Sequence, residues 1–223
     1  MDDIKYRLIR SNRKTLELRV TKDGIVVRAP YNCPTSKIED FIKLKWGWLE
    51  KNIAKVQKYA AIKNTYKLDY DSKLMYRGNR YPIVASEKYG FEDMFFIPPD
   101  LPEAAIRLNC ENIYKYLAKL HFNARVKDFA KIMGVQPTAV KVNSAKRRWG
   151  SCSTEKSINF SWRLVMASDE VIDYVIVHEL AHILEMNHSA EFWAIVELVI
   201  PDYMARRNKL KEYAKIFTEE GWG

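Results

Sequence analysis

The sequence predicts an α+β fold with a strand-rich first part, residues 1–100, and a mainly helical second part, residues 101–223. Short segments in which apolar and polar residues alternate, the pattern of half-buried strands, dominate the first part. Long segments with apolar residues three and four positions apart, the pattern of amphipathic helices, dominate the second part. The chain has 223 residues, 48% of them hydrophobic, which is enough to bury a core in one domain or in two small ones.

Strands open the first part. The segments YRLIRS and TLELRV precede a turn at Lys22-Asp23-Gly24, and IVVRAP follows it, so we expect a hairpin or a meander. A second hairpin is expected at residues 75–84, with its turn at Gly78-Asn79.

A basic amphipathic helix separates these strands. It should run from Lys37 to about Tyr59, with Ser36 as its cap, because apolar residues recur at helical spacing with lysines between them. The residues expected on its apolar face are Ile38, Phe41, Ile42, Trp46, Leu49, Ile53 and Val56.

The second part begins with a long helix. The spacing is helical from Pro102 to about Met133, and Gly134 should end the helix. Its expected buried residues are Ile106, Leu108, Ile113, Leu117, Leu120, Phe122, Val126, Phe129 and Ile132.

Two strands and two helical stretches complete the second part. We expect strands at Val140–Val142 and Ser157–Leu164, with a turn at Arg147–Ser153 between them. Ser168 should then cap a helix that ends near Glu185, since acidic residues in the first turn suit the helix dipole. A last helical stretch should run from Ala190 to about Phe217 and be interrupted by a proline.

The overall composition restricts the class of protein. No segment reaches the roughly 20 apolar residues that cross a bilayer, and Met1–Lys14 does not resemble a targeting signal, so a cytoplasmic protein without membrane contact is expected. Three widely spaced cysteines support neither disulfides nor a cysteine zinc ribbon. The net charge of +9 favours anionic partners such as nucleic acid, acidic peptides or nucleotides, or simply a soluble surface.

The sequence His178-Glu179-Leu180-Ala181-His182 carries the chemistry. It is an H-E-x-x-H motif inside a predicted helix. Residues four apart share a helix face, so His178 and His182 can bind one zinc ion while Glu179 stands beside its water as a general base. The surrounding positions are apolar nearly all round, and burying this polar stripe would be costly unless it bound a metal or were otherwise paired.

A catalytic zinc ion usually has three protein ligands and keeps its fourth position open for water, so a third protein ligand is needed beside His178 and His182. His188 is the leading candidate, because it follows Asn187, a residue that tolerates the left-handed conformation in which helices often end. Its spacing from His182 equals that of H-E-x-x-H-x-x-G-x-x-H enzymes, although Glu185 replaces the glycine. The rival third ligands are Glu185, Glu191 and Glu197.

Two other reactive residues receive structural interpretations. His121 is the one histidine outside the group, and we expect it to be structural. Cys152 could be a metal ligand, a regulatory thiol or part of the cleft, but a small side chain in a tight turn is the more common explanation.

Four motifs resemble the YgjP-like family of predicted metal-dependent hydrolases, relatives of the SprT-type and WLM-type zincin peptidases. They are RWGSCS at residues 148–153, INFSWRLV at 158–165, DYVIVHELAHI at 173–183 and NHSAEFW at 187–193. The resemblance implies a zincin-like core, in which an active-site helix packs under a small mixed sheet, with a metal site of three histidines and a glutamate base.

The resemblance also implies where a substrate would bind. In zincins a strand over the active-site helix pairs with an extended peptide, a role expected here for Ile158–Leu164 or the segment before it. Arg148 could then bind a carboxylate or phosphate, and Ser151 could offer a hydrogen bond. Trp149 and Gly150 could equally have structural duties as a packed ring and a tight turn.

These observations together predict a zinc-dependent hydrolase, foremost a metallopeptidase acting on peptides or proteins. One alternative is a metal-dependent nucleoside triphosphate pyrophosphatase or phosphohydrolase. Another is a nucleic-acid-binding module with a structural metal, in which the basic helix docks on phosphates.

Overall fold

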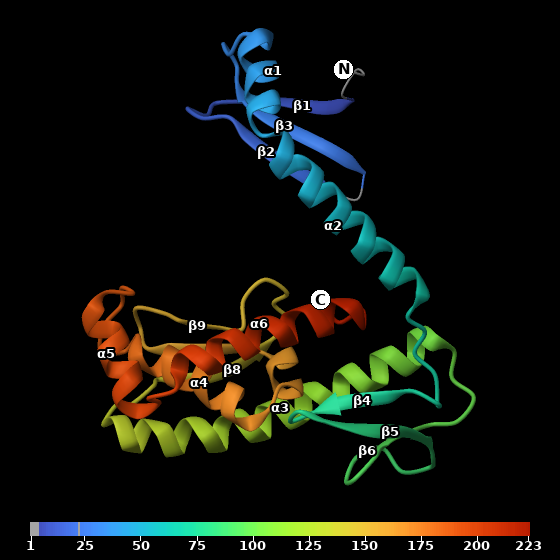
Figure 1. The fold of residues 1–223 in the computed structure, drawn as a ribbon. Coiled ribbons are helices and arrows are strands. Elements are labelled where there is room, and N and C mark those ends of the chain that lie inside the picture. The colour runs from blue at the N-terminus through green and yellow to red at the C-terminus, as the bar shows by residue number, and fades with distance from the viewer. Residues whose placement is uncertain (1–4, 22) are drawn as a thin grey trace. The chain divides into compact units, whose positions relative to one another are not determined.

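The computed structural model describes residues 5–21 and 23–223, with the backbone alone for residues 58–65. The chain forms two compact units, Met1–Tyr66 and Lys67–Gly223. The division therefore falls after Tyr66, whereas the sequence pattern placed it near residue 100. The predicted α+β class is confirmed, because both units combine strands with helices (Figure 1).

In the first unit a three-stranded sheet has the order β1-β3-β2. The expected hairpin is present, since β2 and β3 are antiparallel, but a meander is wrong because β1 pairs with β3 in parallel. The central strand is β3, whose Ile25, Val27 and Ala29 are buried, so the most apolar strand is flanked on both sides. Lys22, in the expected turn, lies outside the described residues. The strands are β1 (Tyr6–Ser11), β2 (Glu17–Thr21) and β3 (Gly24–Pro30).

Two helices, α1 (Thr35–Leu44) and α2 (Trp46–Thr65), replace the single helix that the sequence predicted. The break falls at Lys45, and Gly47, a weak helix former, follows it. Pro34 occupies the N-cap position of α1, so the predicted cap at Ser36 is wrong. The expected apolar face is present except at Trp46, which is exposed, and its fully buried members pack on β3: Ile38, Ile42 and Leu49.

The second unit begins with a four-stranded sheet of order β4-β5-β7-β6. The predicted hairpin is confirmed, but its two turn residues are Arg77 and Gly78, both with positive φ (48° and 79°), rather than Gly78 and Asn79. The Arg77 and Gly78 amides donate to the carbonyls of Val165 (3.0 Å) and Met166 (3.1 Å), which holds Arg77 in a conformation unusual for a side chain of its size. The strands are β4 (Lys73–Tyr76), β5 (Asn79–Ala85), β6 (Gly90–Phe91) and β7 (Phe95–Ile97).

The long helix α3 (Glu103–Met133) is confirmed, and Gly134 ends it in the left-handed conformation (φ 65°). Most of the expected core residues are buried. Three are more than half exposed, because α3 packs on one face only, against α4 (Asp169–Ala181), β7, β8 (Ala139–Asn143) and the 3₁₀ helix that follows β10 (Ser157–Ser161). These three are Leu108, Leu120 and Ile132.

A second, mixed sheet of order β8-β10-β9 precedes the helix that carries the H-E-x-x-H motif. The predicted strand 157–164 ends at Ser161, and the buried residues Trp162–Met166 form a 3₁₀ helix instead. The predicted turn 147–153 contains a strand, β9, that its pattern did not reveal. The strands are β8 (Ala139–Asn143), β9 (Gly150–Cys152) and β10 (Ser157–Ser161).

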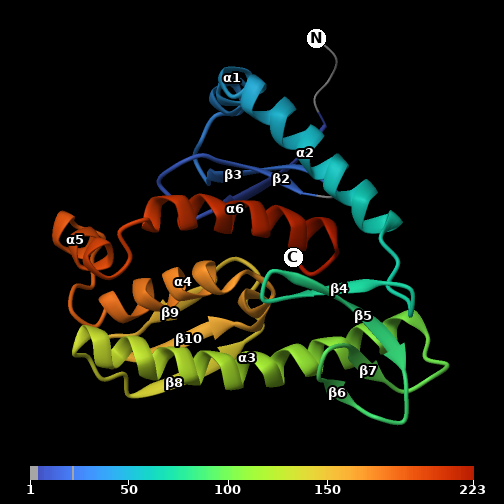
Figure 2. The same cartoon turned by 60° about the horizontal axis from the view of Figure 1, so that its bottom comes forward.

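Three helices, α4 (Asp169–Ala181), α5 (Ala190–Val199) and α6 (Tyr203–Glu219), complete the unit. Ser168 is the N-cap residue of α4 as predicted, although its side chain accepts no capping bond, and α4 ends four residues before Glu185. In both views α4 runs between α6 and α3 (Figure 2), and it also contacts α5 and β9. No helix of the described chain combines the length and the apolar character needed to cross a membrane.

Candidate metal centre

Three histidines meet at the C-terminal end of α4. His178 lies in the last turn of the helix, His182 is the C-cap residue, and His188 follows in the loop before α5. One ligand nitrogen of each ring lies within 4.8 Å of the other two. The Nε2 atoms of His178 and His188 are 3.1 Å apart.

This donor set fits a zinc-type ion. Nitrogens bound to zinc in a tetrahedron at ordinary bond lengths lie about 3.3 Å apart, close to the 3.1 Å between His178 and His188. Burial, reinforced by the neighbouring histidines, lowers the pKa of His178 to about 3, so the ring is neutral and keeps a lone pair. Facing lone pairs repel each other unless a cation or a proton lies between them. Three rival carboxylates lie outside the group: Glu185, Glu191 and Glu197.

The loop between His182 and His188 is held by Glu185. The main-chain oxygen of Glu185 lies 3.2 Å from Nδ1 of His182, and its carboxylate accepts the Asn187 amide at 3.0 Å. Asn187 does not have a positive φ, so the expected left-handed turn is wrong. The hydrogen bond from the Asn187 amide to the Glu185 carboxylate stabilises the turn instead, which explains how the chain turns here with glutamate in place of glycine.

A buried phenylalanine underlies all three imidazoles. The ring centroid of Phe192 lies 4.9, 4.5 and 4.8 Å from those of His178, His182 and His188. Its position is set by the start of α5, where the Ser189 hydroxyl accepts the Phe192 amide. A platform of this kind restricts the ring orientations, so the ligand nitrogens are held in place before any ion binds.

Glu179 lies against the sheet rather than in solvent. It is 6% exposed. A Cβ atom placed on Gly150 would be 2.5 Å from its Oε1 and 2.6 Å from its Cγ, so β9 approaches the carboxyl as closely as a backbone can. Burial raises the pKa of Glu179 to about 8, and the charge of Arg148 opposes this rise.

Glu179 and His178 share a cavity of about 190 Å³ between α4, β9 and α6. Trp149, Tyr174 and Leu210 form much of its wall. The candidate base and one candidate ligand therefore face a common space large enough for water or a small part of a substrate.

A family model for the YgjP-like metallopeptidase domain matches residues 14–213. The chain belongs to this family. Membership makes it a metal-dependent hydrolase at the level of the family. Among solved structures, the crystal structure of the metallopeptidase zymogen of Pyrococcus abyssi abylysin shares 25% sequence identity, covering 44% of this chain and 93% of that one, with a TM-score of 0.36. No curated protein matches the chain.

Within this YgjP-like domain, β9 carries the remaining candidate residues. Arg148, just before the strand, is exposed and acts electrostatically on Glu179. Side chains alternate along a strand, so Gly150 and Cys152 face α4 while Ser151 faces away, and a substrate contact of Ser151 would use its main chain. Cys152 lies near enough for the charge of Glu179 to raise its thiol pKa, although burial is the larger cause.

His121 lies away from this centre of the YgjP-like domain. Its Nε2 is 3.5 Å from Asp169 Oδ1, at the start of α4, and burial lowers the pKa of the ring. This placement agrees with the structural role expected for it.

Sequence patterns missed three residues of the site: Phe192, Tyr174 and Leu210. Phe192 belongs to the family-like motif NHSAEFW, which was the one available signal. Tyr174 precedes His178 by four residues and therefore shares its helix face. Leu210 of α6 carries no local signal, because only tertiary packing brings it to the cavity.

Proposed function

We propose that this chain is a zinc-dependent peptidase in which His178, His182 and His188 hold the ion and Glu179 is the general base. The observation that supports this most is the shared cavity: the buried carboxyl of Glu179 lines the same space as His178, one member of the group of three imidazoles that could hold a metal ion. A structural metal site would need no such base and no such space.

In the proposed reaction each residue of the site would have a separate role. When bound, the ion supplies Lewis-acid chemistry, polarising a peptide carbonyl and acidifying a water molecule. Glu179 accepts the proton of that water at its carboxylate and passes it to the departing amine. Without an ion, burial raises the pKa of Glu179 to about 8; the positive charge of a bound ion nearby would lower it, so that the carboxylate could accept a proton near neutral pH and hold it until the amine departs. The backbone of Gly150 fixes where the carboxylate stands.

A peptide substrate would pair with β9. Of the two segments expected for this role, the one around Ile158 forms the central strand β10, whose two edges are already paired. The strand β9 has a free edge and lies against α4, so an extended peptide could add to it beside the metal centre. Arg148 and the main chain of Ser151 would then contact the substrate.

The test is Glu179→Gln in the full chain, with zinc content and peptide hydrolysis measured together. We expect a loss of kcat of at least about a hundredfold, in the range typical of a missing general base, with zinc content unchanged. Glu212→Gln, which neutralises an exposed carboxylate of α6, is the matched control. Unchanged turnover in Glu179→Gln would end the assignment of the base.

The same preparation separates peptides from nucleotides. Zinc-loaded protein would be incubated with a pool of quenched-fluorescence peptides and, in parallel, with nucleoside triphosphates. Peptide cleavage without phosphate release is expected, whereas phosphate release without peptide cleavage would replace the peptidase by a nucleotide hydrolase.

A further inference from the structure

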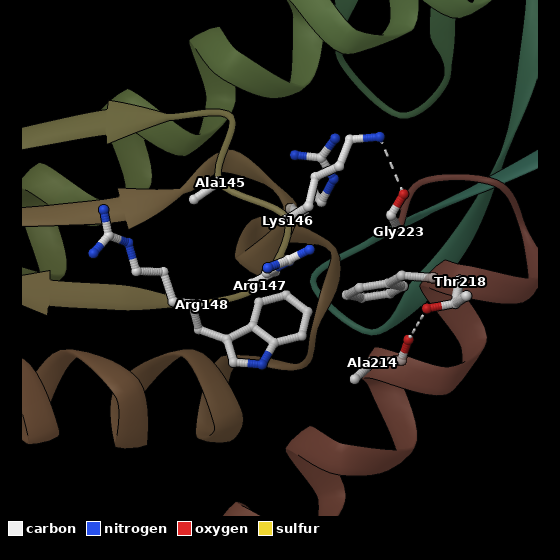
Figure 3. Close-up of a pocket in the computed structure, with 10 residues that line it drawn as sticks. Ala145, Lys146, Arg147, Arg148, Ala214, Thr218 and Gly223 are labelled. Atoms are coloured by element: carbon white, nitrogen blue, oxygen red, sulfur yellow. Dashed lines mark hydrogen bonds between the residues drawn. The ribbon is translucent and has the colours of Figure 1, made fainter. Parts of the chain in front are cut away.

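A second cavity, of about 140 Å³, shares Trp149 with the cavity that contains Glu179. Four of its lining residues are basic: Lys146, Arg147, Arg148 and Arg163. No acidic side chain lines it, although the carboxyl group of Gly223, which Lys146 binds, lies at its wall. In Figure 3 the labelled basic residues follow one another along the loop before β9; Lys146 and Arg147 lie on the side of Gly223 and Thr218, whereas the side chain of Arg148 points away from them.

Arg163 gives this cavity a buried positive charge. The residue is 7% exposed, and its guanidinium lies 4.4 Å from the Trp162 ring. Its Nε donates to the Trp222 carbonyl and its Nη1 to the Ser144 carbonyl at 3.1 Å. Among the described residues no carboxylate comes within 4 Å of it, and burial lowers its pKa more than the charge of Glu111 raises it. Burying a guanidinium against carbonyls alone is costly, and a bound anion would offset that cost.

The excess of positive charge is local. Residues 67–223 contain 22 Lys and Arg and 21 Asp and Glu, so the unit as a whole is nearly neutral. Five of its arginines have a carboxylate within 4 Å: Arg77, Arg80, Arg107, Arg125 and Arg206. Arg147, Arg148 and Arg163 have none among the described residues, although they gather around one cavity. Lys146 is engaged, since its Nζ donates to the Gly223 oxygen at 3.2 Å.

We propose that this cavity binds one anionic group of the substrate, a carboxylate or a phosphate, between Arg147 and Arg163, with Arg148 at its margin. Trp149 lines both cavities, so a ligand anchored here reaches the space beside Glu179 within the width of one side chain. Arginine guanidinium groups suit both anions because their paired N–H donors match two oxygens. That the anion belongs to the substrate rests on the proposed function; that the cavity binds an anion does not.

The binding test uses the metal-free full chain, titrated at low salt with inorganic phosphate and, separately, with acetate, and followed by amide chemical shifts. Saturable shifts are expected around the cavity. Arg147→Gln should weaken binding about fivefold, the effect of one solvent-exposed charge-assisted hydrogen bond, and Arg148→Gln should weaken it less, because its guanidinium points away from Arg147. Lys127→Gln removes the same charge from an exposed position of α3 and should leave the affinity unchanged. Equal affinity in all four proteins, or no saturation in the unaltered one, would overturn the proposal.

A second arm identifies the source of the anion. Zinc-loaded protein would be given peptide pairs that differ by glutamate against glutamine, by a free against an amidated C-terminus, or by phosphoserine against serine. One charged member should be cleaved better, and Arg147→Gln should reduce that preference, measured as the ratio of kcat/KM values, about fivefold. If nothing is cleaved while phosphate still binds, the proposed peptidase function fails and the anion site stands. If peptides are cleaved but no anion binds, the proposed anion site fails and the proposed peptidase function stands.

Discussion

Adding one methyl group at Gly150 should displace the candidate base. In Gly150→Ala the new Cβ would lie 2.5 Å from Oε1, 2.6 Å from Cγ and 2.8 Å from Cδ of Glu179. Atoms rest in contact at about 3.5 Å, so the carboxyl must move by about 1 Å. A displacement of that size costs on the order of a hundredfold in rate, because the proton transfer needs a defined distance. The crowding should also lower the free energy of unfolding by about 1–3 kcal/mol.

The assay is peptide hydrolysis by Gly150→Ala protein whose zinc content and melting temperature are measured on the same sample. Zinc binding should persist, because the three atoms nearest to the added methyl group all belong to Glu179. Gly47→Ala is the matched control: its Cβ would meet nothing within 4 Å, so hydrolysis should be unchanged. A folded, zinc-loaded Gly150→Ala protein with kcat near that of the unaltered chain would refute the reasoning, and so would loss of the metal alone.

Further expectations concern stability. Glu179 should take about 2 kcal/mol from the free energy of unfolding of the metal-free protein between pH 6.5 and 8, because folded Glu179 (pKa about 8) keeps a proton that the unfolded chain has released. The histidines act in the opposite direction, since unfolded imidazoles still release protons near pH 6.5 whereas folded His178 (pKa about 3) has none to release, so the contribution of Glu179 is the difference between the unaltered chain and Glu179→Gln. Urea unfolding of both proteins across this range should show this difference. Tyr114→Phe removes a buried hydroxyl that donates at 2.7 Å to a β4 carbonyl, which should cost about 1 kcal/mol in urea unfolding and spare zinc binding. Ile106→Ala should cost about 2–5 kcal/mol and Leu108→Ala less than about 0.5, as judged by urea midpoints; equal costs would contradict the observed face of α3.

Much of the fold follows from local pattern. The helix α3, its glycine end and the start of α4 at Ser168 match expectation, because helical spacing, capping residues and glycine act on their near neighbours. Periodicity was less informative within α3, where Leu108 has helical spacing but faces solvent. Helical spacing shows which apolar residues lie on the same face of a helix. How many of them are buried depends on the elements that pack against that face.

The candidate site divides in the same way. The order His-Glu-x-x-His fixes two imidazoles on one helix face, so the sequence by itself determined this pair, the neighbouring carboxylate and the family. Only the tertiary structure decided that β9 exists and that it presses Gly150 against Glu179. It also decided that Phe192 lies under the three rings and that three arginines share a cavity. These features join segments distant in sequence, and such contacts depend on strand order and helix packing, which no local spacing of residues encodes.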